Sequence, residues 1–173
     1  KNFKGGIVWG GIAFDKVYEI VYVVTGNPRP ALIGVNRPGK NKNSNSIVAI
    51  DLKKKKIIWT FQDVMHDLWD YDLSHPPIIA DIEYEKGVFE SVIVVGKTGN
   101  VHILHRYSGK HLFSKNFSKV KQSLIPGEIT SKYQININKP EKLIDIGSYE
   151  EQIRRKDYLN NERNLKDSLD YID

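Results

Sequence analysis

The chain has 173 residues, of which 40% are hydrophobic and 27% charged, with a formal net charge of +5 and no cysteine. This composition is typical of a folded globular chain rather than a disordered one. No run approaches the ~18 consecutive apolar residues of a membrane-spanning helix, and without cysteine the chain has no disulfide or thiolate chemistry.

The positive charge lies in the first 145 residues, because seven acidic residues outnumber five basic ones from Ile146 onward. Such a surface could attract nucleic acid, anionic lipid or an anionic cofactor. The densest basic run, residues 53–56, resembles a nucleic-acid patch but lies between two strand-like runs. We therefore interpret it as a solvated hairpin turn and expect no nucleic-acid partner.

Strand-like runs rich in Val, Ile and Tyr dominate the chain up to residue 105. Seven runs are predicted as strands: residues 7–14, 18–24, 46–51, 57–62, 77–82, 88–95 and 101–105. Residues 126–142 are predicted to be irregular. In residues 148–172 apolar side chains recur at helical spacing, which predicts one or two amphipathic helices. We expect two units, residues 1–145 and a charged helical segment at residues 146–173.

The segment His66-Asp67-Leu68-Trp69-Asp70-Tyr71-Asp72 combines four polar groups that can ionise with three bulky apolar side chains. This mixture suits a pocket wall, where apolar rings hold a few polar groups in place and one carboxylate can accept a proton. The alternative is a plain loop whose aspartates cap turns and whose tryptophan fills the core.

Four further motifs accompany this segment along the chain: Val8-Trp9-Gly10-Gly11, Thr25-Gly26-Asn27-Pro28, Arg37-Pro38-Gly39 and Lys97-Thr98-Gly99-Asn100. In this order and spacing the five motifs resemble the pyrroloquinoline quinone (PQQ) dehydrogenases. These are the quinoprotein alcohol and glucose dehydrogenases, which are eight-bladed β-propellers. The resemblance covers residues 5 to about 145, or roughly four fifths of the chain.

A repeat within the chain supports the same family. Ala49-Ile50-Asp51 followed by Trp59 resembles the blade-docking repeat of that family, although two lysines replace its Thr-Gly turn. A second copy occupies residues 103–113, with Ser108-Gly109 at the turn and Phe113 in the place of the tryptophan. The 54-residue spacing is within reach of one propeller blade. We therefore expect an all-β partial propeller of about two to three four-stranded blades, as an internal fragment of a longer protein.

The resemblance also implies roles for individual residues. It implies that Trp9 stacks on PQQ, that Asn27 ligates a cation bound to the cofactor, and that Lys97 donates to the quinone oxygens. It makes Asp70 the general base and a cation ligand, with Asp72 as a further ligand. The implied cation is Ca²⁺, with a lanthanide or Mg²⁺ as alternatives. An amide or carboxylate oxygen is a reasonable ligand for such hard ions.

The resemblance further implies a primary alcohol or an aldose as substrate, a quinone or cytochrome as electron acceptor, and a periplasmic location, with membrane association through another part of the protein. His66 and Asp67 are expected to orient the loop. Three departures are visible: Ile7 stands where the family often has threonine, Lys40 replaces a more usual aspartate, and an acidic cation ligand that usually precedes the Trp9 motif is missing.

Two other functions compete with this one. A non-enzymatic propeller that serves as a scaffold would keep the docking repeat but has no need for Trp9, Asn27, Asp70 and Lys97 together. A metal-dependent hydrolase would need a cluster of metal ligands. The candidates in the sequence are His66, Asp67, Asp70, Asp72 and His75. The spacing of that cluster matches no recognised zinc site.

Overall fold

The computed structural model describes residues 4–85 and 87–143. These residues form strands, turns and loops. They include no helix, and so none long and apolar enough to cross a membrane. The helical segment predicted at residues 146–173, and with it the predicted boundary after residue 145, lies outside the described residues.

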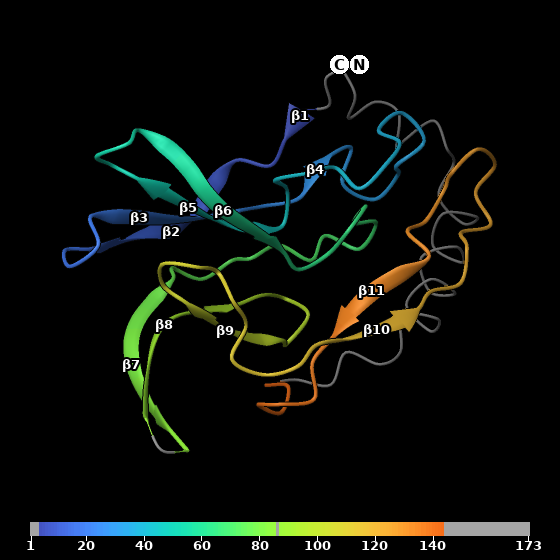
Figure 1. Ribbon diagram of the computed structural model, residues 1–173. Coiled ribbons are helices and arrows are strands. Elements are labelled where there is room, and N and C mark those ends of the chain that lie inside the picture. Colours follow the sequence, from blue (N-terminus) through green and yellow to red (C-terminus); the bar gives the residue numbers. More distant parts are fainter. Residues whose placement is uncertain (1–3, 86, 144–173) are drawn as a thin grey trace.

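Two antiparallel sheets make up most of the described chain. The first sheet contains, in spatial order, β2 (Val8–Asp15), β3 (Ile20–Thr25), β5 (Ser46–Asp51) and β6 (Lys56–Gln62). The second sheet contains β7 (Ile78–Tyr84), β8 (Gly87–Val95) and β9 (Val101–His105). Figure 1 shows the two sheets as separate layers.

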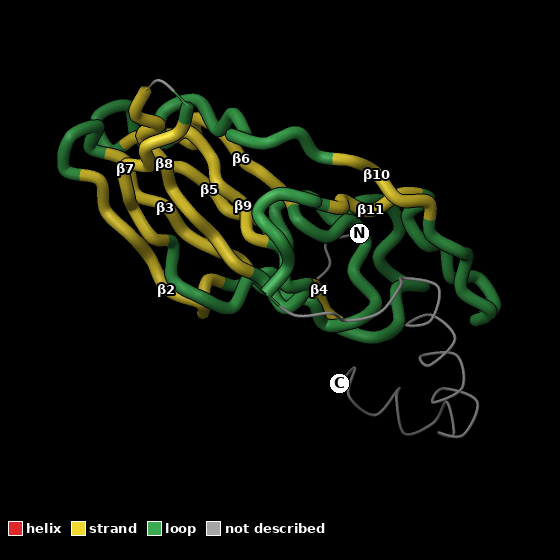
Figure 2. Tube along the Cα trace, turned by 90° about the horizontal axis from the view of Figure 1, so that it is seen from below, coloured by secondary structure: helices red, strands yellow, loops and turns green. Residues whose placement is uncertain are grey.

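Two short strand pairs complete the described part. They are β1 (Lys4–Gly5) with β4 (Pro28–Arg29), and β10 (Asn116–Lys119) with β11 (Tyr133–Asn136). In Figure 1 and Figure 2, β10 and β11 lie beyond one end of the two main sheets.

The all-β class and all seven predicted strands are confirmed, but two local predictions are wrong. The second sheet has three strands rather than four, because the chain pairs with β9 only at the Leu104–His111 bridge before it leaves to form β10. Residues 126–142 are not wholly irregular, because they contain β11. The polar composition of β11 concealed a strand whose Gln134 and Ile135 are buried.

The core lies between the two sheets and follows from the alternation of side chains along each strand. One row crosses all four strands of the first sheet and faces the second sheet: Ala13, Tyr22, Ala49 and Trp59. The second sheet contributes Val92, Val94 and Leu104, all of them almost fully buried. Burial of this apolar surface is the main force that holds the sheets together.

The two copies of the docking repeat meet in this interface. The indole N–H of Trp59 donates to the carbonyl oxygen of Arg106 at 3.1 Å. A Cβ atom added at Gly109 would lie 2.7 Å from the Trp59 ring, and Gly109 has a φ of 67°. Both facts require glycine there. The first copy has Lys55 in the corresponding place, with a φ of 50°.

Arg106 also joins the two sheets through its buried guanidinium group. Its Nη1 atom lies 3.2 Å from a carboxylate oxygen of Asp15 at the end of β2. Its Nη2 atom lies 2.8 Å from Asp81 on β7 and 2.9 Å from Glu90 on β8. A buried arginine needs such partners, and here they come from both layers.

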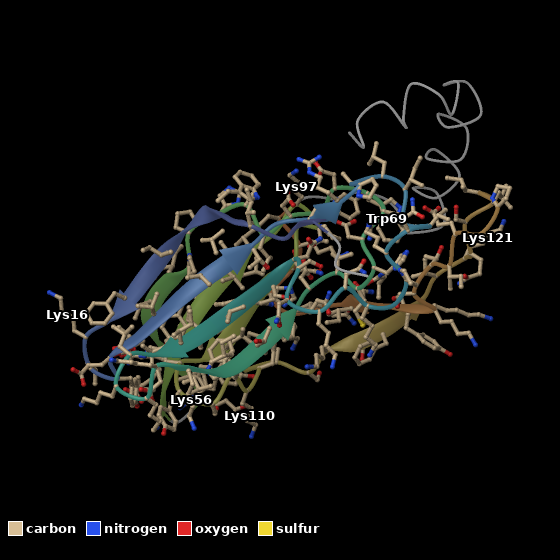
Figure 3. The ribbon with its side chains drawn as sticks, turned by 90° about the horizontal axis from the view of Figure 1, so that it is seen from above. Lys16, Lys56, Trp69, Lys97, Lys110 and Lys121 are labelled. Atoms are coloured by element: carbon tan, nitrogen blue, oxygen red, sulfur yellow. The ribbon has the colours of Figure 1, made fainter. Side chains whose placement is uncertain are left out.

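The sheets have two ends of different character. The turn end consists of the tight connections at residues 15–20, 51–56 and 105–110, whereas the loop end consists of residues 25–46, 62–78 and 95–101. Figure 3 shows Lys16, Lys56 and Lys110 at the turn end and Lys97 near the opposite end, where the long connections gather. All five residues predicted for the cofactor site belong to the loop end or adjoin it.

Candidate functional site

Asp67 organises the segment that the sequence singles out. Its carboxylate is fully buried and accepts hydrogen bonds from the backbone N–H of Trp69 at 2.8 Å, the backbone N–H of Tyr71 at 2.7 Å and the side-chain amide of Asn45 at 2.6 Å. Burial raises the pKa of Asp67 to about 6 even though these donors act in the opposite direction. The expectation that Asp67 orients the loop agrees with these contacts.

The two backbone groups held by Asp67 flank Asp70, which has a φ of 63°. An aspartate in this left-handed region is strained and persists only where its surroundings fix it. Asp67 supplies that constraint, because it holds the backbone N–H groups of the residues before and after Asp70.

Arg37 ties the long loop after β4 to the same segment. The side chain is almost fully buried, and it donates to the carbonyl oxygen of Pro30 at 2.9 Å and to Oδ1 of Asn41 at 2.6 Å. It also donates to the carbonyl oxygen of Asp67. Burial lowers the pKa of Arg37 to about 10, so the group stays cationic at neutral pH.

Lys97 joins the two carboxylates that the sequence proposes for chemistry. Its Nζ atom lies 2.9 Å from Oδ2 of Asp70 and 2.9 Å from Oδ2 of Asp72. Partial burial opposes the charge of Lys97, but the two carboxylates outweigh it and raise its pKa. Asp72 is held further by a hydrogen bond from the backbone N–H of Asn27. The ammonium group of Lys97 therefore pairs with the carboxylates of both Asp70 and Asp72.

In an extended segment, Asp70 and Asp72 would point to the same side, because alternate side chains of a strand share a face. The structure brings the two side chains together, but for a different reason. Asp70 is left-handed rather than extended, so the simple alternation of a strand does not apply to it. Their exposure also differs: the side chain of Asp70 is 44% exposed and that of Asp72 is 9% exposed.

Asn27 carries an unsatisfied oxygen next to these groups. Its amide nitrogen donates to the carbonyl oxygen of Ala31 at 3.2 Å and approaches Oδ1 of Asp70 at 3.4 Å. Its Oδ1 atom is buried and has no hydrogen-bond partner. A buried amide oxygen without a partner is costly, and a hard cation would satisfy it. The donor set of Asn27, Asp70 and Asp72 thus fits an oxygen-binding cation.

Trp9 is placed beside this polar group and not in the core. Its ring lies against Gly26, where any Cβ atom would overlap the indole, and 51% of the residue is exposed. The Nζ atom of Lys97 lies 5.9 Å from the centre of the ring. A flat and half-exposed aromatic surface next to an ammonium group and two carboxylates suits a planar ligand with polar groups at its edge.

The structure therefore brings Trp9, Asn27, Asp70, Asp72 and Lys97 together in one place. It does not assemble the cluster that a metal-dependent hydrolase would need. His66 is buried, with Nδ1 2.7 Å from the carbonyl oxygen of Gly39, whereas His75 is exposed. Among the described residues no three His, Cys, Asp or Glu side chains converge as metal ligands.

Sequence reasoning missed two buried residues that shape the site. Asn45 holds Asp67 and also donates to the carbonyl oxygen of Tyr71 at 2.9 Å. Asp63 receives hydrogen bonds from the turn that carries Lys97. Asn45 lies in a polar run and Asp63 in a mixed segment after β6, and neither local composition gives a sign of a distant partner.

The protein is thus an all-β protein with two stacked antiparallel sheets. At one end of the sheets it has a partly exposed site that combines an aromatic ring, two carboxylates and an ammonium group. Comparison with known families agrees: residues 1–166 match the PQQ family described as glucose/ethanol/alcohol dehydrogenase, beta-propeller domain. The chain belongs to this family.

Relatives of this chain include proteins named as quinoprotein and quinohemoprotein dehydrogenases. The chain is 34% identical over 148 residues to quinoprotein glucose dehydrogenase A of Acinetobacter calcoaceticus, with 79% of this chain and 18% of the relative covered. It is 36% identical over 118 residues to the quinohemoprotein alcohol dehydrogenase of Comamonas testosteroni, with 67% and 17% covered. The chain thus spans less than a fifth of the length of these relatives.

Solved structures agree on the fold. The crystal structure of the Comamonas testosteroni quinohemoprotein alcohol dehydrogenase superposes with a TM-score of 0.60 at 31% identity, over 76% of this chain and 19% of that one. A europium-containing methanol dehydrogenase superposes with a TM-score of 0.55 at 21% identity, over 79% of this chain and 24% of that one. At that identity the second likeness concerns the fold alone.

Proposed function

We propose that this chain is part of a PQQ-dependent dehydrogenase that oxidises a primary alcohol or an aldose, with a quinone or cytochrome as electron acceptor. The observation that carries the proposal is the convergence of Trp9, Asn27, Asp70 and Lys97, four residues that are far apart in the sequence. A scaffold that binds no cofactor has no need to keep a buried amide oxygen unsatisfied or a tryptophan half exposed.

We further propose that the chain supplies about two to three blades of an eight-bladed propeller. The outer face of the first sheet supports this, because it carries a second apolar row across all four strands: Phe14, Val21, Ile50 and Ile57. Phe14 and Ile57, at the two ends of the row, are 48% and 53% exposed. Open apolar faces of this kind are what a preceding blade would cover.

The second sheet has a comparable outer face. Ile78 on β7 lies opposite Ile93 on β8, and Ile78 is 57% exposed. Ile82 and Phe89 form another pair on the same face. Both sheets therefore use one face for each other and offer the second face to a further layer, as blades inside a propeller do.

The residues present would hold the cofactor and cation as follows. Trp9 would support one face of the PQQ ring, and Lys97 would donate to its oxygens, where negative charge develops. Asn27 and the carboxylates of Asp70 and Asp72 would hold the cation. When bound, PQQ supplies the quinone carbon that accepts a hydride, and the cation supplies a Lewis acid.

Asp70 is the residue that we assign as general base. Its carboxylate is the more exposed of the two that contact Lys97, so a substrate hydroxyl can approach it. Asp67 keeps it in position through the backbone N–H groups of Trp69 and Tyr71, the residues on either side. Asp72 is buried and bonded to the backbone of Asn27, which suits a ligand or a structural anchor better than a base.

The test is reconstitution of the complete protein that carries this segment. Apoprotein mixed with PQQ and Ca²⁺ is assayed with a redox dye against a panel of primary alcohols and aldoses. We expect turnover that needs the quinone, the cation and at least one substrate class. A complete, folded protein that binds no PQQ would favour the scaffold, and turnover that is independent of PQQ would contradict the proposal.

A further inference from the structure

The position of the Lys97 ammonium group depends on the turn that carries it. The backbone N–H of Lys97 donates to the carbonyl oxygen of Asp72 at 3.0 Å, and the turn is closed by a hydrogen bond from the N–H of Gly99 to the carbonyl oxygen of Gly96 at 3.0 Å. Lysine has a long and flexible side chain, and this one is 37% exposed. Its Nζ atom can be held at a fixed point only if the backbone beneath it is rigid.

A buried carboxylate from the other sheet holds this turn. Oδ2 of Asp63 accepts a hydrogen bond from the hydroxyl group of Thr98 at 2.9 Å, and Oδ1 accepts one from the amide of Asn100 at 3.1 Å. All three residues have no exposed surface. The turn between β8 and β9 is therefore anchored at the two positions that flank Gly99.

Asp63 is itself fixed with respect to the first sheet and the carboxylate segment. It follows directly after β6, and its backbone N–H donates to the carbonyl oxygen of Asn45 at 2.9 Å. Asn45 in turn holds Asp67 and Tyr71. The support of Lys97 and the support of Asp70 thus meet at two adjoining residues, Asn45 and Asp63.

His102 on β9 completes the environment of Asp63. Its Nε2 atom lies 2.8 Å from Oδ1 of Asp63, and its Nδ1 atom lies 3.3 Å from Nε2 of His111. Burial would raise the pKa of Asp63, but His102, Asn100 and Thr98 outweigh burial and keep the pKa below its usual value. Burial lowers the pKa of His111 to about 4, so His111 stays neutral. An ionised Asp63 can accept from all three donors at once.

We infer that Asp63 is a positioning residue for Lys97: it fixes the turn at residues 96–100 so that the ammonium group faces the carboxylates and the cofactor position. Asp63 does not touch the reacting groups. The effect of its carboxylate on the reaction passes through Lys97, and the inference rests on the role proposed for Lys97 above. The link from Asp63 to Asn45, and through it to Asp67, is made by the backbone N–H of Asp63 and is kept when only the side chain is changed.

A double-mutant cycle in the complete, PQQ-loaded dehydrogenase tests this inference. The four proteins are the wild type, Asp63→Asn, Lys97→Ala and the double variant. Asp63→Asn replaces an acceptor oxygen by an amide that cannot satisfy all three donors. We expect kcat to fall by about tenfold to a hundredfold with little change in KM, because a small misplacement of a charge-stabilising group is costly. In the Lys97→Ala background the same substitution should leave kcat unchanged.

Asp51→Asn is the matched control. Asp51 is another buried aspartate that holds a turn, but it lies at the turn end and contacts Lys54. Its substitution should lower the unfolding temperature without changing kcat in either background. A purely structural role for Asp63 would give this same pattern and would overturn the inference.

The outcomes separate the inference from the function on which it rests. If Lys97→Ala lowers kcat and Asp63→Asn lowers it by the same factor in both backgrounds, the inference fails and the proposed function stands. If Lys97→Ala leaves kcat unchanged, the role of Lys97 fails and the inference with it.

A second pair of variants covers the case in which Asp63→Asn does not fold. Thr98→Val removes one donor to Asp63 with little change of shape, and Thr98→Ser restores the hydroxyl group. The valine variant should lower kcat by about tenfold only when Lys97 is present, and the serine variant should recover most of the loss. Equal kcat values for the two variants would overturn the inference.

Discussion

At the turn end of the first sheet, Asp51 accepts a hydrogen bond from the backbone N–H of Lys54 at 2.8 Å. At the loop end, Asp67 accepts hydrogen bonds from two backbone N–H groups in the same manner. The Lys54 backbone contact lowers the pKa of Asp51, whereas burial raises the pKa of Asp67 to about 6. The same capping chemistry has opposite electrostatic results because Asp51 also pairs with the Lys54 ammonium group and keeps a small exposed surface, whereas Asp67 is fully buried.

The comparison shows what each end of the sheet is built to do. At the turn end the carboxylate of Asp51 also pairs with the ammonium group of Lys54 at 2.9 Å. The charge of Asp51 is therefore neutralised within the turn, and this stabilises the turn. At the loop end Asp67 is kept in an unfavourable environment, and in return it holds Asp70 in a left-handed conformation. At the loop end the protein is therefore less stable than it could be, and in exchange Asp70 is held in position. This is common at functional sites.

The largest difference between the two ends should appear in kcat when an aspartate at each end of the complete dehydrogenase is replaced by asparagine. Asp70→Asn removes the proposed base and should lower kcat by about 10²–10⁴-fold while PQQ binding and stability stay near wild type. Asp51→Asn should lower the unfolding temperature and leave kcat unchanged. Steady-state kinetics and thermal unfolding measure both. Near-normal turnover of Asp70→Asn would remove Asp70 from the mechanism.

Trp9 and Phe14 give a comparison along a single strand. Both lie on β2 and are about half exposed, 51% and 48%, but only Trp9 adjoins the carboxylate and ammonium groups. Trp9→Ala should weaken PQQ binding by roughly 1–3 kcal/mol through lost stacking and burial. Titration of the apoprotein with PQQ measures this loss. Phe14→Ala should leave the dissociation constant unchanged, and an unchanged constant for Trp9→Ala would contradict the assignment.

The contributions of Asp67 and Asp51 to stability should depend on pH with opposite signs. The pKa of Asp67 is higher in the folded protein than in the unfolded chain, so between pH 6 and about 4 the folded form binds the extra proton. The stability of the wild type relative to Asp67→Asn should therefore rise by about 1–3 kcal/mol as the pH falls through this range.

For Asp51 the folded pKa is lowered, so its contribution is present above the unfolded pKa and is lost as the pH falls through the folded value. Denaturant unfolding of the wild type and the two asparagine variants, from pH 7 to well below the ordinary aspartate pKa of about 4, measures both signs. The account of Asp67 fails if the wild type loses stability relative to Asp67→Asn on acidification.

The smallest effect concerns the two copies of the docking repeat. Lys55 has a φ of 50° and Gly109 a φ of 67° at corresponding places. Lys55→Gly removes the strain of a left-handed lysine and should raise the free energy of unfolding by about 0.5–1 kcal/mol. Gly109→Ala should lower it, because its Cβ atom would lie 2.7 Å from the Trp59 ring. Denaturant unfolding ranks the two variants, and destabilisation by Lys55→Gly would show that Lys55 makes contacts that outweigh its strain.

The strands could be predicted from the sequence because the signals that mark them are local. Alternating Val, Ile and Tyr and the turns between them are readable without knowledge of partners, so all seven predicted runs are strands. The prediction failed for β11, where polar residues form a strand because Gln134 is buried and bonded to the backbone of Met65 at 2.9 and 2.6 Å. Such a contact spans 69 residues of sequence.

The same distinction applies to the site. Trp9, Asn27, Asp70 and Lys97 were predictable because they stand in motifs that resemble a family. Asp63 and Asn45 were not, since their partners lie far along the chain: His102 is 39 residues from Asp63, and Asp67 is 22 residues from Asn45. The residues that we propose to contact the cofactor carry a sequence signature, whereas the residues that hold them in place are found only in the folded structure.

The most direct test of the central claim is a crystal structure of the complete dehydrogenase loaded with PQQ and Ca²⁺. We predict that the quinone ring lies on the indole of Trp9, that Lys97 donates to its oxygens, and that the cation takes Oδ1 of Asn27 and the carboxylate of Asp70 as ligands. A structure in which the quinone binds elsewhere, or in which Oδ1 of Asn27 remains without a partner, would contradict the account.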